Sequence, residues 1–487
     1  MEKLKRTLFF WFLVLVFCLI TPVIVLQAKG YRFDWHRGVF VFSGTISFKS
    51  NPQTVSAELN GILNENKKLN RINSSFNVSG LLPDDYTLKI LAPGYNTWEK
   101  KIDVHSGISS EFWNIVLTRT DYKKTNYPET TGIETFFTSP KNRFIAYTQD
   151  DNQNLLVKIL DLNDSSIAST FSLPNWKLLS LEKKENIEWS PEESYLSIPV
   201  EKDGNETFYI ADITLGTVTN LNDFFGKNEI RHVRWDPKSK GYFFFLEGQT
   251  LFRGNIADKN DLVVIASDAP TYELSYDSVF FVQLPNNLVF KTNLDGTVEK
   301  LQITSDFPGQ ADTPIDRMIV YDQSRIAFLD KNQNLFIYND ALRDKYFHQI
   351  GNHIVEMHFS NDGKKLLFWS NNEISVYFAR DWDVQPIRKE DELSSITRYS
   401  DTLQNVGWYK DYEHIIFSVG KYTKIIELDP RDHRNCLDLI TTTLETPQVI
   451  HNHGLEKIFY TDLENGTPVL NSFIFPEPVP ILGIGGA

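Results

Sequence analysis

The residues whose side chains could bind a metal ion or take part in a reaction form a few short clusters of imidazole and carboxylate groups. His451 and His453 stand two residues apart, so on a strand they share one face and offer half of a metal site. The acidic pairs Asp150-Asp151 and Glu192-Glu193 suggest cation binding, but they lack the spaced oxygen ligands of a calcium loop. Both patterns are also typical of polar turns, and we favour that interpretation.

One basic cluster stands next to an aromatic residue. Arg231, His232 and Arg234 precede Trp235, a combination found where proteins bind anions or bases. The alternating spacing equally fits the polar face of an ordinary strand, which is the interpretation we favour.

Sequence motifs of enzymes are missing from the chain. The sequence holds no G-x-S-x-G elbow, Walker A loop, H-E-x-x-H or G-x-G-x-x-G. The two cysteines, Cys18 and Cys436, form no C-x-x-C pair, and an internal disulfide is implausible. We therefore assign no catalytic, cofactor-binding or metal-ligating residue, expect no cofactor, and predict that the protein is not an enzyme.

Composition narrows the class of protein further. The 487 residues carry a formal charge of −14, which disfavours a general nucleic-acid partner. Aromatic residues make up 13%, which suits strand-rich packing. The length allows more than one domain.

An apolar segment lies near the N-terminus. Thr7 to Leu26 holds no charge and is long enough to cross a hydrocarbon core as a helix. Lys3, Lys5 and Arg6 precede it. A cleaved signal peptide is the alternative, but the apolar run exceeds the usual length. We predict a cytoplasmic tail at 1–6, a transmembrane anchor at 7–28, and the bulk of the chain outside the cytoplasm.

Residues 38–119 alternate like a small antiparallel β-sandwich. Asn60-Gly61 is a strong hairpin turn because both residues accept positive φ. The expected strands are Gly44 to Phe48, Ser56 to Leu59, Arg71 to Val78, Tyr86 to Leu91 and Phe112 to Leu117.

The order of motifs in this region resembles the PEGA family of extracytoplasmic sandwich modules. The matching motifs, in order, are Ser50-Asn51-Pro52, Ala57 to Gly61, Gly80 to Tyr86, Pro93-Gly94-Tyr95 and Trp98. The Pro-Glu-Gly-Ala tetrad that names the family is not intact, since Pro52-Gln53 runs into Thr54. The resemblance implies a surface spacer or binding module.

A polar linker at 120–133 leads into a repeated pattern. Residues 186–221 show it best, as four short strands separated by Gly, Pro, Asn and Asp turns. The pattern recurs about every forty residues, which is the period of a four-stranded β-propeller blade. The eight copies begin near Glu134, Asn186, Ile230, Pro270, Ile315, Ile354, Thr402 and Pro447.

The last copy supplies only three strands, so we predict that a strand from residues 121–133 completes it. We expect an all-β propeller over 134–476 with eight blades, followed by a disordered tail at 477–487. Seven blades remain the alternative, with the weak copy around Pro270 to Leu301 as an insertion.

Short motifs within the copies resemble TolB-like and other WD40-like propellers. The matches are a polar turn before an apolar strand, Ser360 to Phe368, and aspartate-ended third strands, Tyr209 to Asp212 and Val157 to Asp161. The resemblance implies the fold and leaves the ligand open.

The sequence favours a membrane-anchored, extracytoplasmic binding or scaffolding protein of the cell envelope. Its partner would be an envelope protein or glycan bound through propeller loops, because face loops vary freely. The candidate loops are Lys177–Glu185, Arg380–Tyr399 and Asp429–Asn435, all charged. The alternative is a propeller lyase, hydrolase or lactonase with its site at the central channel. A third class, a sensor, would need a cytoplasmic output module, for which six residues are too few.

Overall fold

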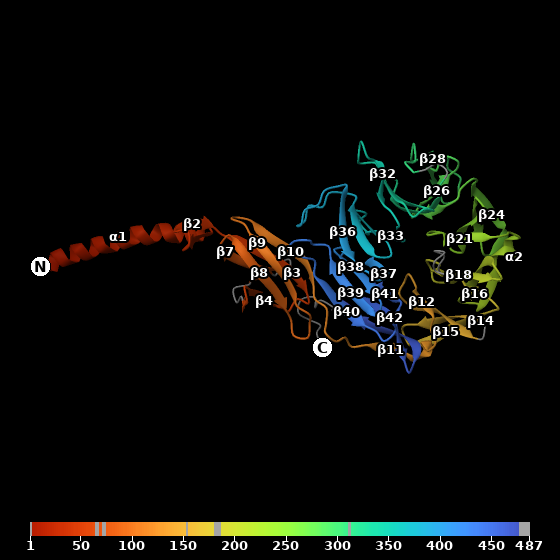
Figure 1. The fold of residues 1–487 in the computed structure, drawn as a ribbon, viewed down its shortest axis with the longest axis horizontal. Helices are drawn as coiled ribbons and strands as arrows, with labels where there is room; N and C mark the ends of the chain where they lie inside the picture. Colours follow the sequence, from red (N-terminus) through yellow and green to blue (C-terminus); the bar gives the residue numbers. More distant parts are fainter. Residues whose placement is uncertain are drawn as a thin grey trace.

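The computed structural model describes residues 2–63, 68–70, 75–151, 154–179, 187–309 and 313–476, so the predicted disordered tail at 477–487 lies outside the described residues. The chain begins with one long helix, α1 (Glu2–Ala28), which projects from the folded body (Figure 1). Within its segment Lys3–Ala28 an 18-residue window has a mean hydropathy of 2.9, and none of that window is buried in the protein. By length and composition the helix can cross a membrane.

A two-stranded hairpin follows α1 directly. It consists of β1 (Tyr31–Asp34) and β2 (Val39–Phe42), which pair antiparallel. This hairpin was not predicted from the sequence. It separates the helix from the sandwich, whose first strand begins at Gly44.

Two four-stranded sheets form the sandwich. The first has the order β10 (Ser109–Val116), β3 (Gly44–Asn51), β7 (Ser75–Leu81) and β6 (Lys68–Asn70), and the second the order β5 (Ile62–Leu63), β4 (Ser56–Leu59), β8 (Asp84–Leu91) and β9 (Trp98–Val104). The inner faces meet in one core around Phe48, Trp98 and Phe112.

The expected strands of the sandwich differ from the observed ones in number, bounds and arrangement. Strands β5 and β6 were not predicted, and the expected strand Arg71 to Val78 corresponds to β7, with residues 71–74 outside the described residues. The purely antiparallel arrangement is wrong for one pair, because β10 lies parallel to β3. Strand β9 was not predicted at all, although Trp98, Ile102 and Val104 alternate inward along it.

The C-terminal part is a ring of β-sheets. The first four sheets are β12 (Thr135–Thr138), β13 (Phe144–Asp151), β14 (Asn154–Asp161) and β15 (Ser166–Pro174); β16 (Lys177–Leu178), β17 (Glu188–Trp189), β18 (Tyr195–Lys202), β19 (Asn205–Asp212) and β20 (Thr217–Asn220); β21 (Ile230–Trp235), β22 (Tyr242–Glu247), β23 (Thr250–Asn255) and β24 (Asp258–Ala266); and β25 (Tyr272–Leu274), β26 (Ser278–Gln283), β27 (Leu288–Asn293) and β28 (Leu301–Gln302).

The remaining sheets complete the ring. They are β29 (Ile315–Asp322), β30 (Arg325–Asp330), β31 (Leu335–Asn339) and β32 (Phe347–Gly351); β33 (Glu356–Phe359), β34 (Lys365–Trp369), β35 (Glu373–Phe378) and β36 (Glu392–Arg398); β37 (Leu403–Trp408), β38 (His414–Val419), β39 (Tyr422–Glu427) and β40 (Cys436–Thr441); and β41 (Val449–Asn452), β42 (Lys457–Glu464), β43 (Thr467–Ile474) and β11 (Thr125–Tyr127).

The circular array of antiparallel sheets makes this part a β-propeller. Inner strands such as β21, β33 and β37 face the centre of the ring, while β24 and β40 lie on its outer side (Figure 1). Apolar residues of neighbouring sheets pack between them, as Trp189 of one sheet packs on Phe144 of the preceding one. Each sheet thereby buries faces that it could not bury alone.

Strand β11 closes the ring. It pairs antiparallel with β43, which confirms the prediction that a strand from 121–133 completes the last copy. At the seam between the last and first sheets, the Gln448 amide pairs with the backbone of Phe136. The Phe136 N–H donates to Oε1 of Gln448 and Nε2 of Gln448 donates to the Phe136 carbonyl, both at 2.8 Å. The Gln448 side chain thus adds a pair of hydrogen bonds between the last and the first sheet.

A short helix, α2 (Leu221–Phe225), stands where the sequence had predicted the end of a strand. Asn220 caps it, since its side-chain oxygen accepts hydrogen bonds from the backbone N–H groups of Asn222 and Asp223. The expectation of a strand through Leu221 is therefore wrong by this one residue.

Candidate functional site

The sandwich docks on two loops of the propeller. In Figure 1 it lies beside β36 and β38–β40. The loops are residues 379–391, between β35 and β36, and residues 428–435, between β39 and β40. We call the contact between these loops and strands β9 and β10 the junction.

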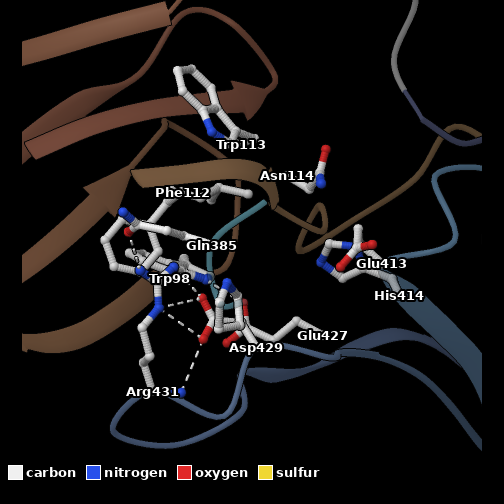
Figure 2. Close-up of a pocket in the computed structure, with 12 residues that line it drawn as sticks. Trp98, Phe112, Trp113, Asn114, Gln385, Glu413, His414, Glu427, Asp429 and Arg431 are labelled. Carbon is white, nitrogen blue, oxygen red and sulfur yellow. Dashed lines mark hydrogen bonds and ion pairs between the residues drawn. The ribbon is translucent and has the colours of Figure 1, made fainter. Parts of the chain in front are cut away.

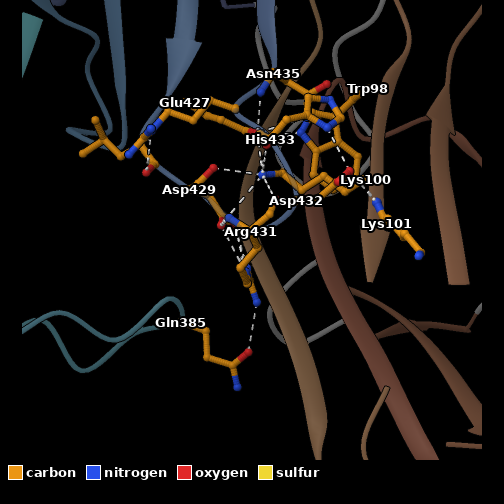
Figure 3. Close-up of polar contacts among 12 residues, drawn as sticks. Trp98, Lys100, Lys101, Gln385, Glu427, Asp429, Arg431, Asp432, His433 and Asn435 are labelled. Carbon is orange, nitrogen blue, oxygen red and sulfur yellow. Dashed lines mark hydrogen bonds and ion pairs between the residues drawn. The ribbon is translucent and has the colours of Figure 1, made fainter. Parts of the chain in front are cut away.

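A buried lysine forms the centre of the junction. Lys100 of β9 is 0% exposed and donates hydrogen bonds to the carbonyls of Asp429, Arg431 and His433 at 2.9, 2.8 and 2.6 Å. Its ammonium also lies 2.8 Å from Oε1 of Glu427 (Figure 3). A buried charge is tolerated only when it is paired and hydrogen-bonded, so the 428–435 loop is shaped around this side chain.

The carboxylates that face Lys100 have further donors. The indole Nε1 of Trp98 donates to Oε2 of Glu427 at 2.9 Å, which ties the sandwich core to the propeller. Burial pushes the pKa of Asp429 up, but Arg431 and Lys100 outweigh burial and hold this pKa below its usual value. The junction therefore favours the charged form of Asp429.

Arg431 joins the two domains from the propeller side. Its guanidinium lies 3.9 Å from the ring centroid of Phe112 in β10. Nη2 of Arg431 donates to the Glu111 carbonyl at 2.7 Å and to Oδ2 of Asp429 at 2.6 Å. A stacked and forked contact of this kind uses the planar shape of arginine, which lysine lacks.

Two amide side chains cover the open edges of the sandwich. Strands β9 and β10 are edge strands of their sheets and carry backbone groups without a neighbouring strand. Gln385 accepts from the N–H of Glu111 at 3.0 Å and donates to the carbonyl of Ser109 at 3.0 Å. Asn435 makes the same pair of contacts with the N–H and carbonyl of Glu99, at 3.4 and 3.1 Å. Each amide thus substitutes for a residue of a further strand.

A small polar cavity lies inside the junction. Its volume is about 30 Å³, and Figure 2 shows Glu413, His414 and Glu427 on the propeller side facing Trp98 and Phe112 of the sandwich. This volume holds one or two waters, whereas a small-molecule site needs roughly 300 Å³ or more. The cavity is therefore part of a structural contact.

Further ion pairs lie beneath this cavity. Lys365, which is 1% exposed, pairs with Glu413, and Nδ1 of His414 lies 2.8 Å from Oδ2 of Asp411. Burial lowers the pKa of His414, but Asp411 outweighs burial and raises this pKa above its usual value. The imidazole is thereby held in its charged form further into the neutral pH range.

A second charged cluster lies on the inner strands of the ring. Arg234 of β21 lies 3.3 Å from Glu188 of β17, and Arg317 of β29 pairs with Glu356 of β33. Glu273 of β25 stands between the arginines, and burial raises its pKa although Arg234 and Arg317 oppose the shift. We call these five residues the channel cluster. Its cavity of about 50 Å³ leaves room for a few waters, and the pairs link successive sheets.

The channel cluster explains the basic residues noted in the sequence. A β-bulge between Arg231 and Arg234, with His232 at a φ of 50°, directs Arg234 toward the acidic neighbours. The prediction of an ordinary strand face missed this arrangement, because the carboxylates come from other repeats.

The two histidines near the C-terminus lie together, and the favoured interpretation as a polar turn is wrong for His451, which belongs to strand β41. The ring centroids of His451 and His453 are 4.7 Å apart, and His451 stacks on Tyr409 at 5.1 Å. Burial lowers the pKa of His451 to about 3. Among the described residues no group of three His, Cys, Asp or Glu side chains is arranged to hold a metal ion.

The acidic pairs occupy turns and hairpin ends. Asp151 pairs with Asn154 at the end of the β13–β14 hairpin. Glu193 instead links two sheets, since its Oε1 accepts from the N–H of Lys141 at 2.7 Å. No third acidic ligand joins either pair in the part of the chain that the structure covers.

An open polar recess lies at the far side of the ring from the sandwich. Its volume is about 880 Å³ and it is lined by Asn175, Lys177, Glu201, Lys202, Asp203 and Gly204. Residues 180–185 of the candidate loop Lys177–Glu185 lie outside the described residues. The other two candidate loops contain the junction residues Gln385 and Arg431, so they already bind the sandwich.

Comparisons with known proteins give only structural similarities at low sequence identity. No protein-family model matches the chain, and no curated protein sequence matches it. Similar solved structures include the Dos1 propeller, with 12% identity and a TM-score of 0.47 over 72% of this chain and 95% of that one. The Cps50 (Swd1) propeller domain of Myceliophteria thermophila has 13% identity and a TM-score of 0.39, over 70% of this chain and 99% of that one. Kluyveromyces lactis Hsv2 has 9% identity and a TM-score of 0.42, over 63% of this chain and 98% of that one.

Proposed function

We propose that the protein is a single-pass, membrane-anchored and extracytoplasmic binding or scaffolding protein of the cell envelope. In this proposal α1 is the anchor, the PEGA-like sandwich is a spacer, and the eight sheets are eight blades of the propeller. The partner is an envelope protein or glycan, and the protein performs no catalysis.

The observation that carries the binding role is the recess at the far side of the ring. Its volume of about 880 Å³ lies within the range of ligand sites, whereas the cavity in the junction is too small. Charged groups of both signs, Lys177, Lys202 and Asp203, line it. Trp176 lies beside them, with the Lys202 ammonium 5.9 Å from its ring centroid. Aromatic and polar side chains at one recess suit a sugar or a polar peptide.

The binding proposal is tested by retention of a partner from envelope extracts on the immobilised full chain. We expect Lys202→Glu combined with Asp203→Lys to lose the partner, and binding to wild type to weaken with salt because exposed charges are screened. Lys331→Glu, an exposed charge change on another sheet, is the matched control. Equal retention by all three proteins would contradict the assignment of the recess.

The anchoring proposal has its own test. Protease added to intact cells or spheroplasts should remove residues 30–487, while the chain fractionates with membranes. Protection of the bulk of the chain together with a cytoplasmic control would contradict the proposed topology.

A propeller enzyme is the second candidate, and the channel cluster favours it. Glu273 has a raised pKa next to arginines, the kind of perturbation that catalytic acids show. Turnover of envelope glycans that Glu273→Gln abolishes, without a change in melting temperature, would replace the binding proposal.

A further inference from the structure

The hairpin that follows α1 has one aromatic face. The register pairs Tyr31 with Phe42 and Phe33 with Phe40, so these four rings lie on the same side of the two strands. Their ring centroids are 5.2 Å apart within each pair, and Trp35 packs on Phe33 at 4.8 Å. An isolated two-stranded hairpin is marginally stable in water unless one face is covered.

Much of this apolar surface is uncovered by the protein. On this face Trp35 is 86% exposed and Phe42 is 41% exposed. Gly107 of the β9–β10 turn lies against the Phe42 ring, and its neighbour Ile108 is 53% exposed. Large apolar side chains gathered at one site usually mark a surface that contacts a partner or a membrane.

Basic side chains border the patch. Lys29, Arg32 and Arg37 lie within nine residues, in a chain whose formal charge is −14. The one acidic residue, Asp34, is buried, and its Oδ1 accepts from the backbone N–H of His36 at 2.9 Å and of Arg37 at 3.2 Å. Its Oδ2 lies 3.5 Å from Nε of Arg37, whose side chain is 64% exposed, so three basic groups face a single acidic one. The hairpin therefore presents positive charge on a protein that is negative as a whole.

The hairpin is also fixed to the end of the helix. Nη1 of Arg32 donates to the carbonyl of Gln27 at 3.3 Å, and Ser43 donates through its N–H and its hydroxyl to the carbonyl of Gly30 at 3.0 and 2.7 Å. Only two residues separate Ala28 from Tyr31, a path of at most about 10 Å. The headgroup layer is of similar thickness on each side of the hydrocarbon core, roughly 5–8 Å.

We propose that this hairpin lies in the headgroup layer of the bilayer that α1 crosses, an inference that rests on the proposed single-pass anchoring. Its aromatic face, with Trp35, inserts between the lipids, and Lys29 and Arg37 contact the phosphates of anionic lipids. Tyrosine and tryptophan favour this layer because their rings are apolar and their polar atoms stay wet. Juxtamembrane basic residues are attracted to anionic headgroups.

The test uses the full chain reconstituted in vesicles of phosphatidylcholine with phosphatidylglycerol. Cys18→Ser and Cys436→Ser remove the native thiols, and Trp35→Cys then carries an environment-sensitive fluorophore. Tyr276→Cys, at a position 75% exposed on the propeller, is the matched control. We expect the fluorescence emission of the label at position 35 to shift to shorter wavelength. We also expect this emission to be quenched by lipids that carry a spin label near the headgroup. The label at position 276 should behave as in water.

Flotation of the same vesicles separates the two possible failures. A chain that does not float contradicts the proposed anchoring and the present inference with it. A chain that floats, with the label at position 35 as accessible to water as the label at 276, overturns the headgroup inference alone. If Lys29 and Arg37 contact anionic lipids, quenching of the label at position 35 should be weaker in vesicles of pure phosphatidylcholine. It should also be weaker in the double variant Lys29→Glu, Arg37→Glu. Quenching that is insensitive to both changes overturns the proposed contact of Lys29 and Arg37 with anionic headgroups.

A second measurement avoids the cysteine-free background. Intrinsic fluorescence of wild type is compared with that of Trp35→Phe in vesicles of brominated lipid. The difference isolates Trp35, which we expect to be quenched. An unquenched difference spectrum in floated vesicles would again overturn the inference.

Discussion

Replacement of Lys100 by methionine should open the junction. Methionine keeps most of the apolar stem but removes the ammonium that contacts Glu427 and three carbonyls. Glu427, which is 5% exposed, then remains as a buried carboxylate without its cation. Loss of one partner of a buried ion pair costs about 3–5 kcal/mol. At about 1.4 kcal/mol per tenfold, the closed junction becomes roughly 100- to 3000-fold less favoured over the open one.

Hydrogen exchange of the full chain measures this change. The backbone amides of β9 and of residues 428–435 should lose protection in Lys100→Met, while amides in the central strands of distant sheets keep theirs. Lys101→Met is the matched control on the same strand. The side chain of Lys101 is 61% exposed and pairs with Asp85 at the surface, where ion pairs contribute little.

A second substitution tests the electrostatic cause. Glu427→Gln in the Lys100→Met background removes the unpaired charge while keeping an acceptor for Trp98, so protection should partly return. Equal loss of protection in Lys100→Met and Lys101→Met would refute the assigned role of Lys100. If the second substitution lowered protection further, the buried charge would not be the cause.

Three further predictions concern the amide contacts and a buried imidazole. Gln385→Ala with Asn435→Ala should speed exchange at the edge amides of β9 and β10, because each lost hydrogen bond costs about 1 kcal/mol; exchange unchanged from wild type would contradict the edge-covering role. Gln448→Glu cannot donate to β12 and should lower the melting temperature, whereas the exposed Gln323→Glu serves as control and should not. The raised pKa of His414 adds stability that is complete below about 6.5 and is lost as the pH rises through the folded value. Thermal melts of His414→Gln should therefore show a flatter pH dependence than wild type above that pH, and parallel curves would be inconsistent with this linkage.

The positions of the repeated sheets could be predicted from the sequence because each sheet is formed by residues close together in the chain. The first strands of four sheets begin within one residue of the predicted starts of their copies, at Thr135, Ile230, Ile315 and Leu403, and three others begin within two residues. The second sheet differs, because β16 begins at Lys177, before the predicted start at Asn186. Turn residues and apolar strands within forty residues carry that signal. The weak copy around Pro270 forms a four-stranded sheet of its own, β25–β28, and is not an unstructured insertion.

Strand β9 escaped prediction for a physical reason. Trp98, Lys100, Ile102 and Val104 all point inward, and a lysine at an inward position breaks the alternation that reveals a strand. Its position is favourable only because Glu427 stands opposite, more than three hundred residues later in the chain. A sequence reading cannot supply that partner.

The charged loops were predicted as recognition surfaces, and the structure changes that picture in part. The loops around Gln385 and Arg431 recognise a polar surface, but that surface is the sandwich of the same chain. A signal was present, since Lys100 in one segment complements Asp429 in the other. Length and charge singled out these loops, but the contact that the structure shows is with the same chain, and binding of an envelope partner stays a prediction.

These contacts constrain how the propeller can be presented to a partner. A lone membrane helix would leave the attached body free to swing, but the junction joins sandwich and propeller through Lys100, Arg431 and the two amides. The contacts of Arg32 and Ser43 likewise fix the hairpin at the helix end. In Figure 1 the strands β14, β16 and β18 next to the recess lie at the opposite end of the molecule from α1. With the hairpin held in the headgroup layer as proposed, the recess would point away from the membrane, where an envelope partner can reach it.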